Sequence, residues 1–164
     1  MFKICMLFLL ISAVSFPAYP HAQTKEKILV IKSERVLLLL KNNKIAKEYK
    51  IALGKNPVGD KVKQGDNKTP EGKYQIVSKN SQSKFYLNLA INYPSKLDIK
   101  EAKRLGVNPG GNIVIHGLPN KAPSFIHEEL MSEDWTNGCI ALHNSDIKDL
   151  FDSVPIGTSI DIIP

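Results

Sequence analysis

The sequence predicts a mainly β domain, built like a β-sandwich and trimmed with a few short helices. Short apolar runs rich in Val, Ile and Leu recur along the chain, and turn-forming residues separate them. Only two segments combine helical periodicity with end signals. This pattern is typical of sandwich-like folds. The 164 residues suffice for one domain with a substantial core, and no internal repeat or low-complexity linker divides them.

The expected strands are short and follow one another closely. Between the second and third, the stretch KNNK at residues 41–44 predicts a hairpin turn. Several strands alternate apolar and polar residues, while NIVIHG at residues 112–117 reads as a buried run. The expected strands are residues 28–33, 35–42, 45–53, 72–79, 85–93, 112–117 and 158–164.

Two helices are expected. Residues 98–106 carry Asp98 as a candidate N-cap and end at Gly106. Residues 144–155 begin at Asn144, present one apolar face and stop at Pro155. A third, shorter helix within residues 123–134 is expected to form a flap over the site.

A polar segment rich in Gly, Pro and Asp, residues 54–74, interrupts the strand pattern. It reads either as a loose surface connection or as a functional loop, because structureless loops of this length are otherwise uncommon.

The first 22 residues have the layout of a secretory signal peptide. One cation, Lys3, precedes an apolar run that is shorter than the roughly 20 residues of a transmembrane helix. We expect cleavage after Ala22, with Ala18 as the alternative, and no later segment long enough to span a bilayer. The mature chain is therefore expected in the periplasm or cell wall, without stable membrane insertion.

Composition narrows the classes of partner. The formal charge is +6 and falls to about +5 once Lys3 leaves with the signal. Lysine supplies nearly all of this excess, which suits an anionic cell-wall polymer or simple solubility. No block of like charge points to nucleic acid, so no nucleic-acid partner is expected.

Of the 2 cysteines, Cys5 lies in the signal, so the mature chain keeps Cys139 alone. A lone thiol in an oxidising compartment reads as a buried small hydrophobe, half of an intermolecular disulfide, a metal ligand or a reactive nucleophile. Its neighbours bear on the choice. His116 ends a buried strand, either as a core residue or as a base that takes the thiol proton and lowers the thiol pKa. Gly138 permits a tight turn before the thiol, so that nearby amides can face an oxyanion.

The order of these residues removes several alternatives. Papain-like enzymes place Cys before His, and sortases need an arginine downstream of the cysteine, where this chain has none. Two further histidines, His127 and His143, complete a possible zinc set with His116 and Cys139. The spacing H-x10-H-x11-C-x3-H lacks the close ligand pairs of structural zinc sites, so no metal is expected.

Several stretches together resemble the L,D-transpeptidase catalytic domain family of the YkuD type. They are IHG at residues 115–117, WTNGCIAL at 135–142, LGKNPVGDKVKQGDNKTPEGKYQI at 53–76, LNLAINYPS at 87–95 and GGNIVIHG at 110–117. The resemblance covers residues 27–163, which we take as the catalytic domain, and implies the family's sandwich-like fold.

The resemblance also implies roles. Cys139 matches the nucleophile and His116 the general base, whose ring the backbone carbonyl of Gly117 would orient. Thr136 and Gly138 match the turn that shapes the oxyanion hole.

The chain departs from the family pattern at two positions. Asn137 replaces the usual second histidine and is expected to be structural or to assist the oxyanion. Ala141 replaces an arginine that would be a candidate clamp for a substrate carboxylate. Trp135 either lines the substrate cleft or packs beside the turn.

The implied reaction is acyl transfer on peptidoglycan stem tetrapeptides, with release of D-alanine and 3–3 cross-linking or attachment of wall proteins. The same resemblance leaves open an L,D-carboxypeptidase or other hydrolase, and a non-catalytic wall-binding module. No cofactor is required, and β-lactams of the carbapenem type are the expected inhibitors.

Overall fold

The computed structural model describes residues 26–164 and confirms the mainly β fold. The predicted signal peptide, residues 1–22, lies outside the described residues. The strands are β1 (Glu26–Ile31), β2 (Val36–Lys41), β3 (Lys44–Lys50), β4 (Gly72–Ser83), β5 (Tyr86–Ile91), β6 (Val114–His116), β7 (Ile140–Ala141) and β8 (Ser159–Ile163). The helices are α1 (Lys96–Arg104), a 3-10 turn η1 (Ser124–Ile126), α2 (His127–Leu130) and α3 (Asn144–Ser153).

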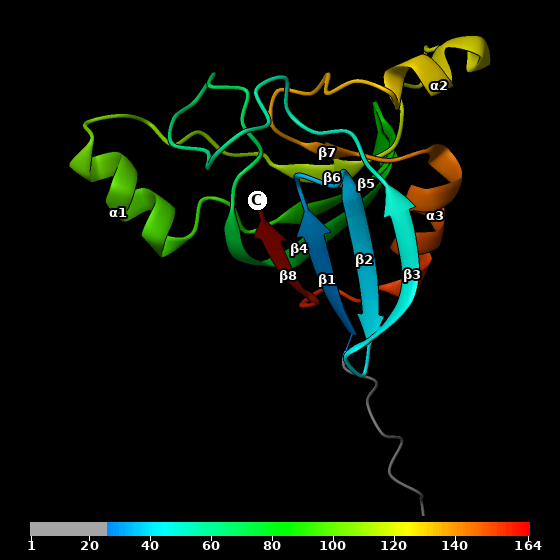
Figure 1. The fold of residues 1–164 in the computed structure, drawn as a ribbon, viewed down its shortest axis with the longest axis horizontal. Coiled ribbons are helices and arrows are strands. Elements are labelled where there is room, and N and C mark those ends of the chain that lie inside the picture. The colour runs from blue at the N-terminus through cyan, green and yellow to red at the C-terminus, as the bar shows by residue number, and fades with distance from the viewer. Residues whose placement is uncertain (1–25) are drawn as a thin grey trace, which may run out of the picture.

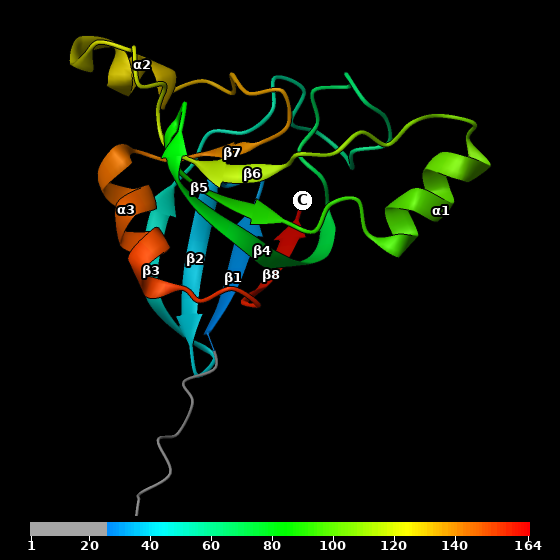
Figure 2. The ribbon, with the colours of Figure 1, turned by 180° about the vertical axis from the view of Figure 1, so that it is seen from behind.

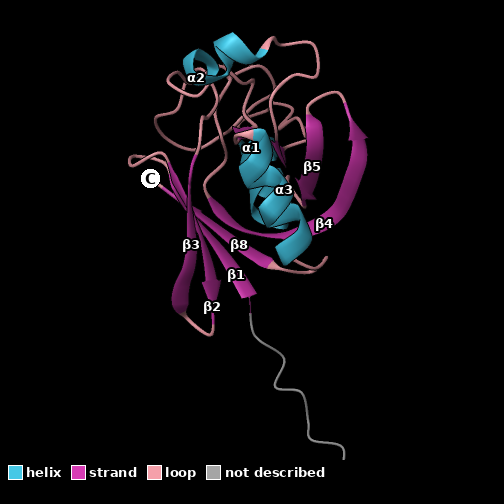
Figure 3. Ribbon diagram, turned by 90° about the vertical axis from the view of Figure 1, so that its right-hand side faces the viewer, coloured by secondary structure: helices cyan, strands magenta, loops and turns pink. Residues whose placement is uncertain are grey.

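One mixed sheet, rather than two separate ones, builds the sandwich-like fold. Its strand order is β3-β2-β1-β8-β4-β5-β6-β7. The pairs β1–β8 and β6–β7 are parallel, and the other neighbours are antiparallel. The long strand β4 belongs to both halves: its first part pairs with β8 and its later part with β5, across two register shifts. Seen from the side, β3, β2 and β1 lie on one side and β5 with the end of β4 on the other (Figure 3).

The main core lies between the two halves of the sheet. Its fully buried members come from both halves and from α3, which packs against β5. Examples are Leu37 on β2, Ile115 on β6 and Leu150 on α3, each 0% exposed. Burying such side chains stabilises the fold by roughly 1.5–3 kcal/mol each. α1 projects away on the side opposite α3 (Figures 1 and 2).

The predicted hairpin is present between β2 and β3. Asn42 and Asn43 both adopt positive φ, 52° and 62°. Two successive left-handed residues form the turn that matches the twist of an antiparallel pair, and Asn tolerates this conformation.

Both long helices form, but their caps differ from the expectation. α1 starts earlier, at Lys96, and its N-cap is Ser95; Asp98 completes a capping box by accepting from the Ser95 amide at 2.6 Å. In α3 the N-cap is His143, whose side chain makes no cap hydrogen bond. Asn144, the expected cap, is the first helical residue, and its Oδ1 atom accepts from the backbone amide of Leu118 at 2.9 Å.

Three loops gather at one end of the molecule, at the top in Figure 1: residues 54–71 before β4, 105–113 before β6 and 131–139 before β7. This end carries the candidate site. Within residues 26–164, no helix is long and apolar enough to cross a membrane.

Candidate active site

Adjacent parallel strands bring Cys139 close to His116. In β6 and β7, Ile115 pairs with Ile140 and His116 with Ala141, and Cys139 directly precedes β7. Because side chains alternate between the two faces of a strand, Cys139 and His116 lie on the same face, two residues apart in register. Both line one cleft of about 700 Å³. The strand β7 has only two residues, too few to produce a pattern in the sequence.

The backbone fixes the tautomer of His116. Its Nδ1 atom lies 2.6 Å from the carbonyl oxygen of Gly117, and a carbonyl only accepts hydrogen bonds. Nδ1 therefore carries the proton, and in the neutral ring Nε2 keeps a lone pair that can accept one. The ring is held by Phe85 and Trp135, at centroid distances of 4.6 Å and 5.6 Å. Phe85 was not among the predicted site residues, because it reaches the site through the pairing of β5 with β6.

Hydrogen bonds of the Thr136 hydroxyl hold the turn before Cys139 in place. The Thr136 hydroxyl donates to the carbonyl of Cys139 at 2.7 Å and accepts from the amide of Gly138 at 3.0 Å. This internal bond occupies the Gly138 N–H group, so Gly138 shapes the turn rather than offering a free donor. Asn137 is exposed and lines the cleft.

Gly138 is the position where a side chain has no room. Its φ is +126°, and a Cβ atom there would lie 2.6 Å from the carbonyl oxygen of Lys68. We expect Gly138→Ala to lower the free energy of unfolding by roughly 2 kcal/mol. Displacement of the thiol should also reduce the rate of the acyl transfer that the resemblance implies roughly 10²-fold. Thermal unfolding and single-turnover kinetics measure the two effects.

The matched control is Gly106→Ala. Gly106 also has positive φ, +67°, but a Cβ atom there meets nothing within 4 Å. The Gly106→Ala protein should lose some stability and keep the wild-type rate of acyl transfer. Equal rates for Gly138→Ala and the wild type would contradict the tight-turn argument.

Burial shifts the pKa of both the thiol and the imidazole toward the neutral form. Burial raises the pKa of Cys139, and a backbone hydrogen bond from Val114 and the charge of Lys61 offset only part of this. Burial likewise lowers the pKa of His116, although its bond to Gly117 opposes the shift. The Cys139 thiol donates to the Asn112 carbonyl, with Sγ 3.7 Å from the oxygen. Within residues 26–164, no hydrogen bond joins Sγ to the His116 ring. Hydrogen bonds between a nucleophile and its base are often long in ligand-free proteins and tighten when substrate binds.

Trp135 lines the cleft, and its ring also packs against the ring of His116. Its indole Nε1 atom is buried without a hydrogen-bond partner among the described residues. The predicted flap, residues 123–134, does form the short helices η1 and α2, but none of its residues lines this cleft. A flap role for this segment stays a prediction. Asp134 at its end binds Arg35, with Oδ2 2.6 Å from Nη2.

The long polar loop is a built structure rather than a loose connection. Asp66 accepts from the Lys61 ammonium at 2.7 Å and from the amides of Val62, Lys63 and Lys68 at 2.9–3.1 Å. Lys61 itself is only 5% exposed. Through Lys68, whose carbonyl abuts Gly138, Asp66 supports the catalytic turn.

A second buried lysine ties the other end of this loop to the sheet. The Lys32 ammonium donates to the Gly59 and Thr69 carbonyls at 2.8 Å and 3.0 Å, and to Glu71 at 2.8 Å.

Ionisation of Asp66 should make the free energy of unfolding depend on pH. Burial of its carboxyl opposes ionisation, but the Lys61 ammonium and the three amides outweigh burial and lower the pKa of Asp66 to about 2. Since the unfolded value is about 3.9, the ionised carboxylate stabilises the folded state fully above pH ~4, and this contribution of about 2 kcal/mol fades as pH falls toward 2.

Asp66→Asn should therefore lower the free energy of unfolding at pH 7, and the deficit should shrink below pH ~4. Urea denaturation between pH 2 and 7 measures this. Asp152→Asn, which removes the same charge from an exposed pair with Lys148, should change stability little. A deficit that stayed constant across the pH range would contradict the assignment.

The remaining residues of interest lie away from the cleft. His127 Nε2 lies 3.1 Å from the Ala122 carbonyl oxygen, and His143 Nε2 lies 3.8 Å from a carboxylate oxygen of Glu128. Ala141 is fully buried beside Leu118. Among residues 26–164, no group of three or more His, Cys, Asp or Glu side chains is arranged to hold a metal ion.

Known proteins share this architecture. The model of the YkuD family, the L,D-transpeptidase catalytic domain, matches residues 25–162. YqjB of Bacillus subtilis (strain 168), provisionally named an L,D-transpeptidase, is 26% identical over 169 aligned positions, covering 97% of this chain and 83% of that protein.

Solved structures agree. Bd1075 of Bdellovibrio bacteriovorus has a TM-score of 0.61 at 29% identity, covering 85% of this chain and 48% of the other. The helical cell shape determining protein Pgp2 of Campylobacter jejuni has a TM-score of 0.66 at 28% identity, covering 86% and 48%. This chain therefore spans about half the length of both.

The L,D-transpeptidase LdtMt1, solved in complex with imipenem, shares the fold with a TM-score of 0.55 at 17% identity, covering 85% of this chain and 59% of the other. The family model spans nearly the whole described chain, and the fold agrees with it. The chain therefore belongs to the L,D-transpeptidase catalytic domain family.

Proposed function

We propose that this chain is an exported cysteine L,D-transpeptidase that acts on peptidoglycan stem tetrapeptides in the periplasm or cell wall. The observation that carries the proposal is the placement of Cys139 and His116 on one face of β6–β7, in one cleft, with the His116 Nε2 lone pair available. The apolar leader in the sequence supports export to the compartment where stem peptides occur.

In the proposed reaction, His116 Nε2 takes the Cys139 proton as the sulfur attacks the carbonyl carbon of the third stem residue. The oxyanion would be stabilised by the N–H group of Cys139 and the side chain of Asn137. The amide C–N bond then breaks, and D-alanine leaves with the proton from His116. A thioester remains on Cys139.

An amine from a neighbouring stem completes the transfer. It attacks the thioester and gives its proton to His116, the C–S bond breaks, and the sulfur recovers the proton. Space for an acceptor stem peptide supports transfer to an amine, because a hollow of about 640 Å³ lies next to the cleft and shares Asn112 and Asn137 with it. Water in place of the amine would make the enzyme an L,D-carboxypeptidase, the second candidate.

Product analysis distinguishes the candidates. Purified residues 23–164 are incubated with disaccharide tetrapeptides, and the products are separated and weighed. Transfer yields 3–3 dimers and free D-alanine, whereas hydrolysis yields tripeptides and D-alanine alone. Substrate recovered unchanged, with saturable binding, would leave a non-catalytic wall-binding module as the function.

Acylation by carbapenems is proposed on the same nucleophile, supported by the complex of LdtMt1 with imipenem. Incubation with imipenem should add the mass of one drug molecule to the protein.

A further inference from the structure

The catalytic cleft carries positive charge without a compensating acid. Among the described residues, its lining includes Lys55 and Lys84 and no aspartate or glutamate. Neither of these two ammonium groups has a hydrogen bond or ion pair with another described residue. Lys61, which lines the neighbouring hollow, and the buried Lys32 are each paired with a carboxylate. The two lysines of the cleft are therefore free to bind an anion from solution.

Lys55 is fixed beside the nucleophile. Its backbone N–H group donates to the Thr136 carbonyl at 3.0 Å, next to the bridge between Gly54 and Thr136. Thr136 in turn closes the turn that carries Cys139. The position of the Lys55 backbone is thus set by the same turn that sets the sulfur.

Lys84 is fixed beside the base. It directly precedes Phe85, whose ring packs 4.6 Å from the ring of His116. Its carbonyl accepts from the amide of Asn120 at 3.0 Å. Lys55 is therefore anchored at the turn that carries Cys139, and Lys84 is anchored next to the ring that packs on His116.

Strand β7 offers no cation to this cleft, because Ala141 is buried in a small cluster with Ala52, Leu118 and Met131. We propose that Lys55 and Lys84 are specificity-determining residues that bind carboxylates of the substrate peptide, one beside Cys139 and the other beside His116. This inference rests on the proposed function. A stem tetrapeptide supplies at least two such groups, the C-terminal carboxylate of D-alanine and the carboxylate of its isoglutamate residue.

Trp135 provides a direct measure of binding. It is the single tryptophan of the chain and lines the cleft. Its fluorescence is followed while Cys139→Ala protein is titrated with three tetrapeptides: the free acid, the C-terminal amide and the isoglutamine form. Lys55→Met and Lys84→Met are then introduced separately.

We expect each lysine variant to weaken binding of the free acid roughly fivefold, near the upper end for an exposed ion pair. Each should lose no further affinity when its own partner carboxylate is amidated, so the double-mutant cycle assigns one carboxylate to each lysine. Arginine at either position should restore most of the affinity, and added salt should weaken binding in the parent more than in the variants.

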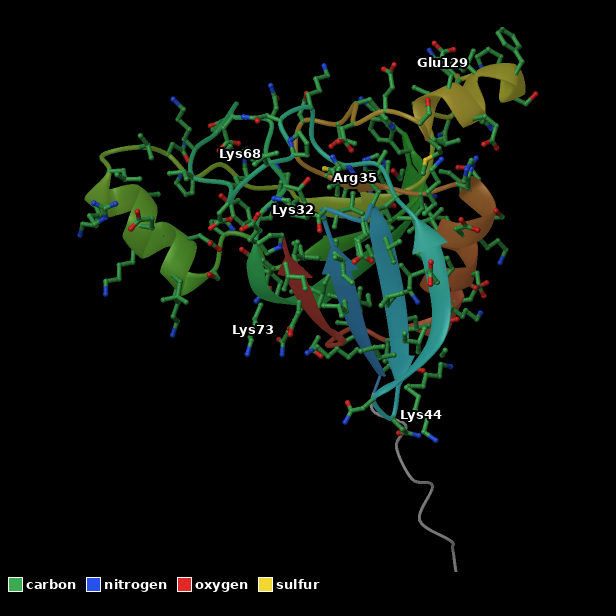
Figure 4. All side chains as sticks on the ribbon, viewed as in Figure 1. Lys32, Arg35, Lys44, Lys68, Lys73 and Glu129 are labelled. Atoms are coloured by element: carbon green, nitrogen blue, oxygen red, sulfur yellow. The ribbon has the colours of Figure 1, made fainter. Side chains whose placement is uncertain are left out.

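Lys44→Met is the matched control. Lys44 lies at the end of the β2–β3 hairpin, at the opposite end of the molecule from the loop that holds Lys68 (Figure 4). It removes the same charge and should leave binding unchanged.

Unchanged affinity in both cleft variants overturns the proposal, as does the absence of saturable binding. Lysine-dependent binding without turnover by the wild type would refute the transpeptidase reaction and keep the carboxylate sites. Turnover with the same KM in the wild type and both variants would keep the transpeptidase reaction and refute the carboxylate sites.

Discussion

Cys139→Ala is expected to reduce turnover of stem tetrapeptides on the order of 10⁶-fold, as removal of a catalytic nucleophile does elsewhere. Without the sulfur no thioester forms, so both the dimer and the tripeptide should disappear. Mass spectrometry should find one imipenem per wild-type molecule and none on the variant. These outcomes separate an enzyme from a wall-binding module that merely retains the fold.

The variant should fold normally, because the sulfur makes only weak hydrogen bonds, to the Asn112 carbonyl and with the backbone of Val114. Circular dichroism and peptide binding through Trp135 fluorescence check this. Within residues 26–164, Cys139 is the only free cysteine, so a thiol reagent should label the wild type once and Cys139→Ala not at all. Turnover by Cys139→Ala above 1% of the wild-type rate would refute covalent catalysis through this residue.

His116→Gln should have the second largest effect, lowering kcat roughly 10²–10⁴-fold. Glutamine can still donate to the Gly117 carbonyl but cannot carry a proton between sulfur and leaving group. Burial lowers the pKa of His116 below its ordinary 6.5, so the wild-type acid limb should lie below pH 6.5, where the imidazole gains a proton and ceases to be a base. Initial rates between pH 4.5 and 9 measure both effects.

His127→Gln is the control, since that ring contacts only the loop carbonyl of Ala122 and lies off the cleft. It should retain the wild-type rate and profile. An unchanged acid limb in His116→Gln would mean that another group titrates there.

Alkylation of the free protein gives a separate test of the resting state. Because burial raises the pKa of Cys139 above its ordinary 9.0, labelling should be slow near pH 7 and still rising at pH 9. Fast labelling at neutral pH would instead support a thiol pKa lowered by His116, as the sequence analysis expected.

Local patterns in the sequence predicted most of the fold. Apolar periodicity located the long strands, and KNNK located the hairpin, because both depend on near neighbours. The helix caps were harder: Ser95 and Asp98 both have cap chemistry, and only the backbone distinguishes the cap from the third helical residue.

The site was predicted only in part. Motif resemblance pointed to Cys139 and His116, and the structure places them in one cleft. Lys55, Phe85 and Asn112 gave no signal, since they reach the cleft through strand and loop pairings distant in sequence. The directions of the two pKa shifts also could not be read from residue types, because both follow from burial.

The position of β8 has a consequence for folding. This strand pairs with β1 along one edge and with β4 along the other, so among residues 26–164 it links β1, β2 and β3 to the rest of the sheet. Without Ser159–Ile163 the two halves of the sheet lose their shared neighbour, and the core between them stays open to water.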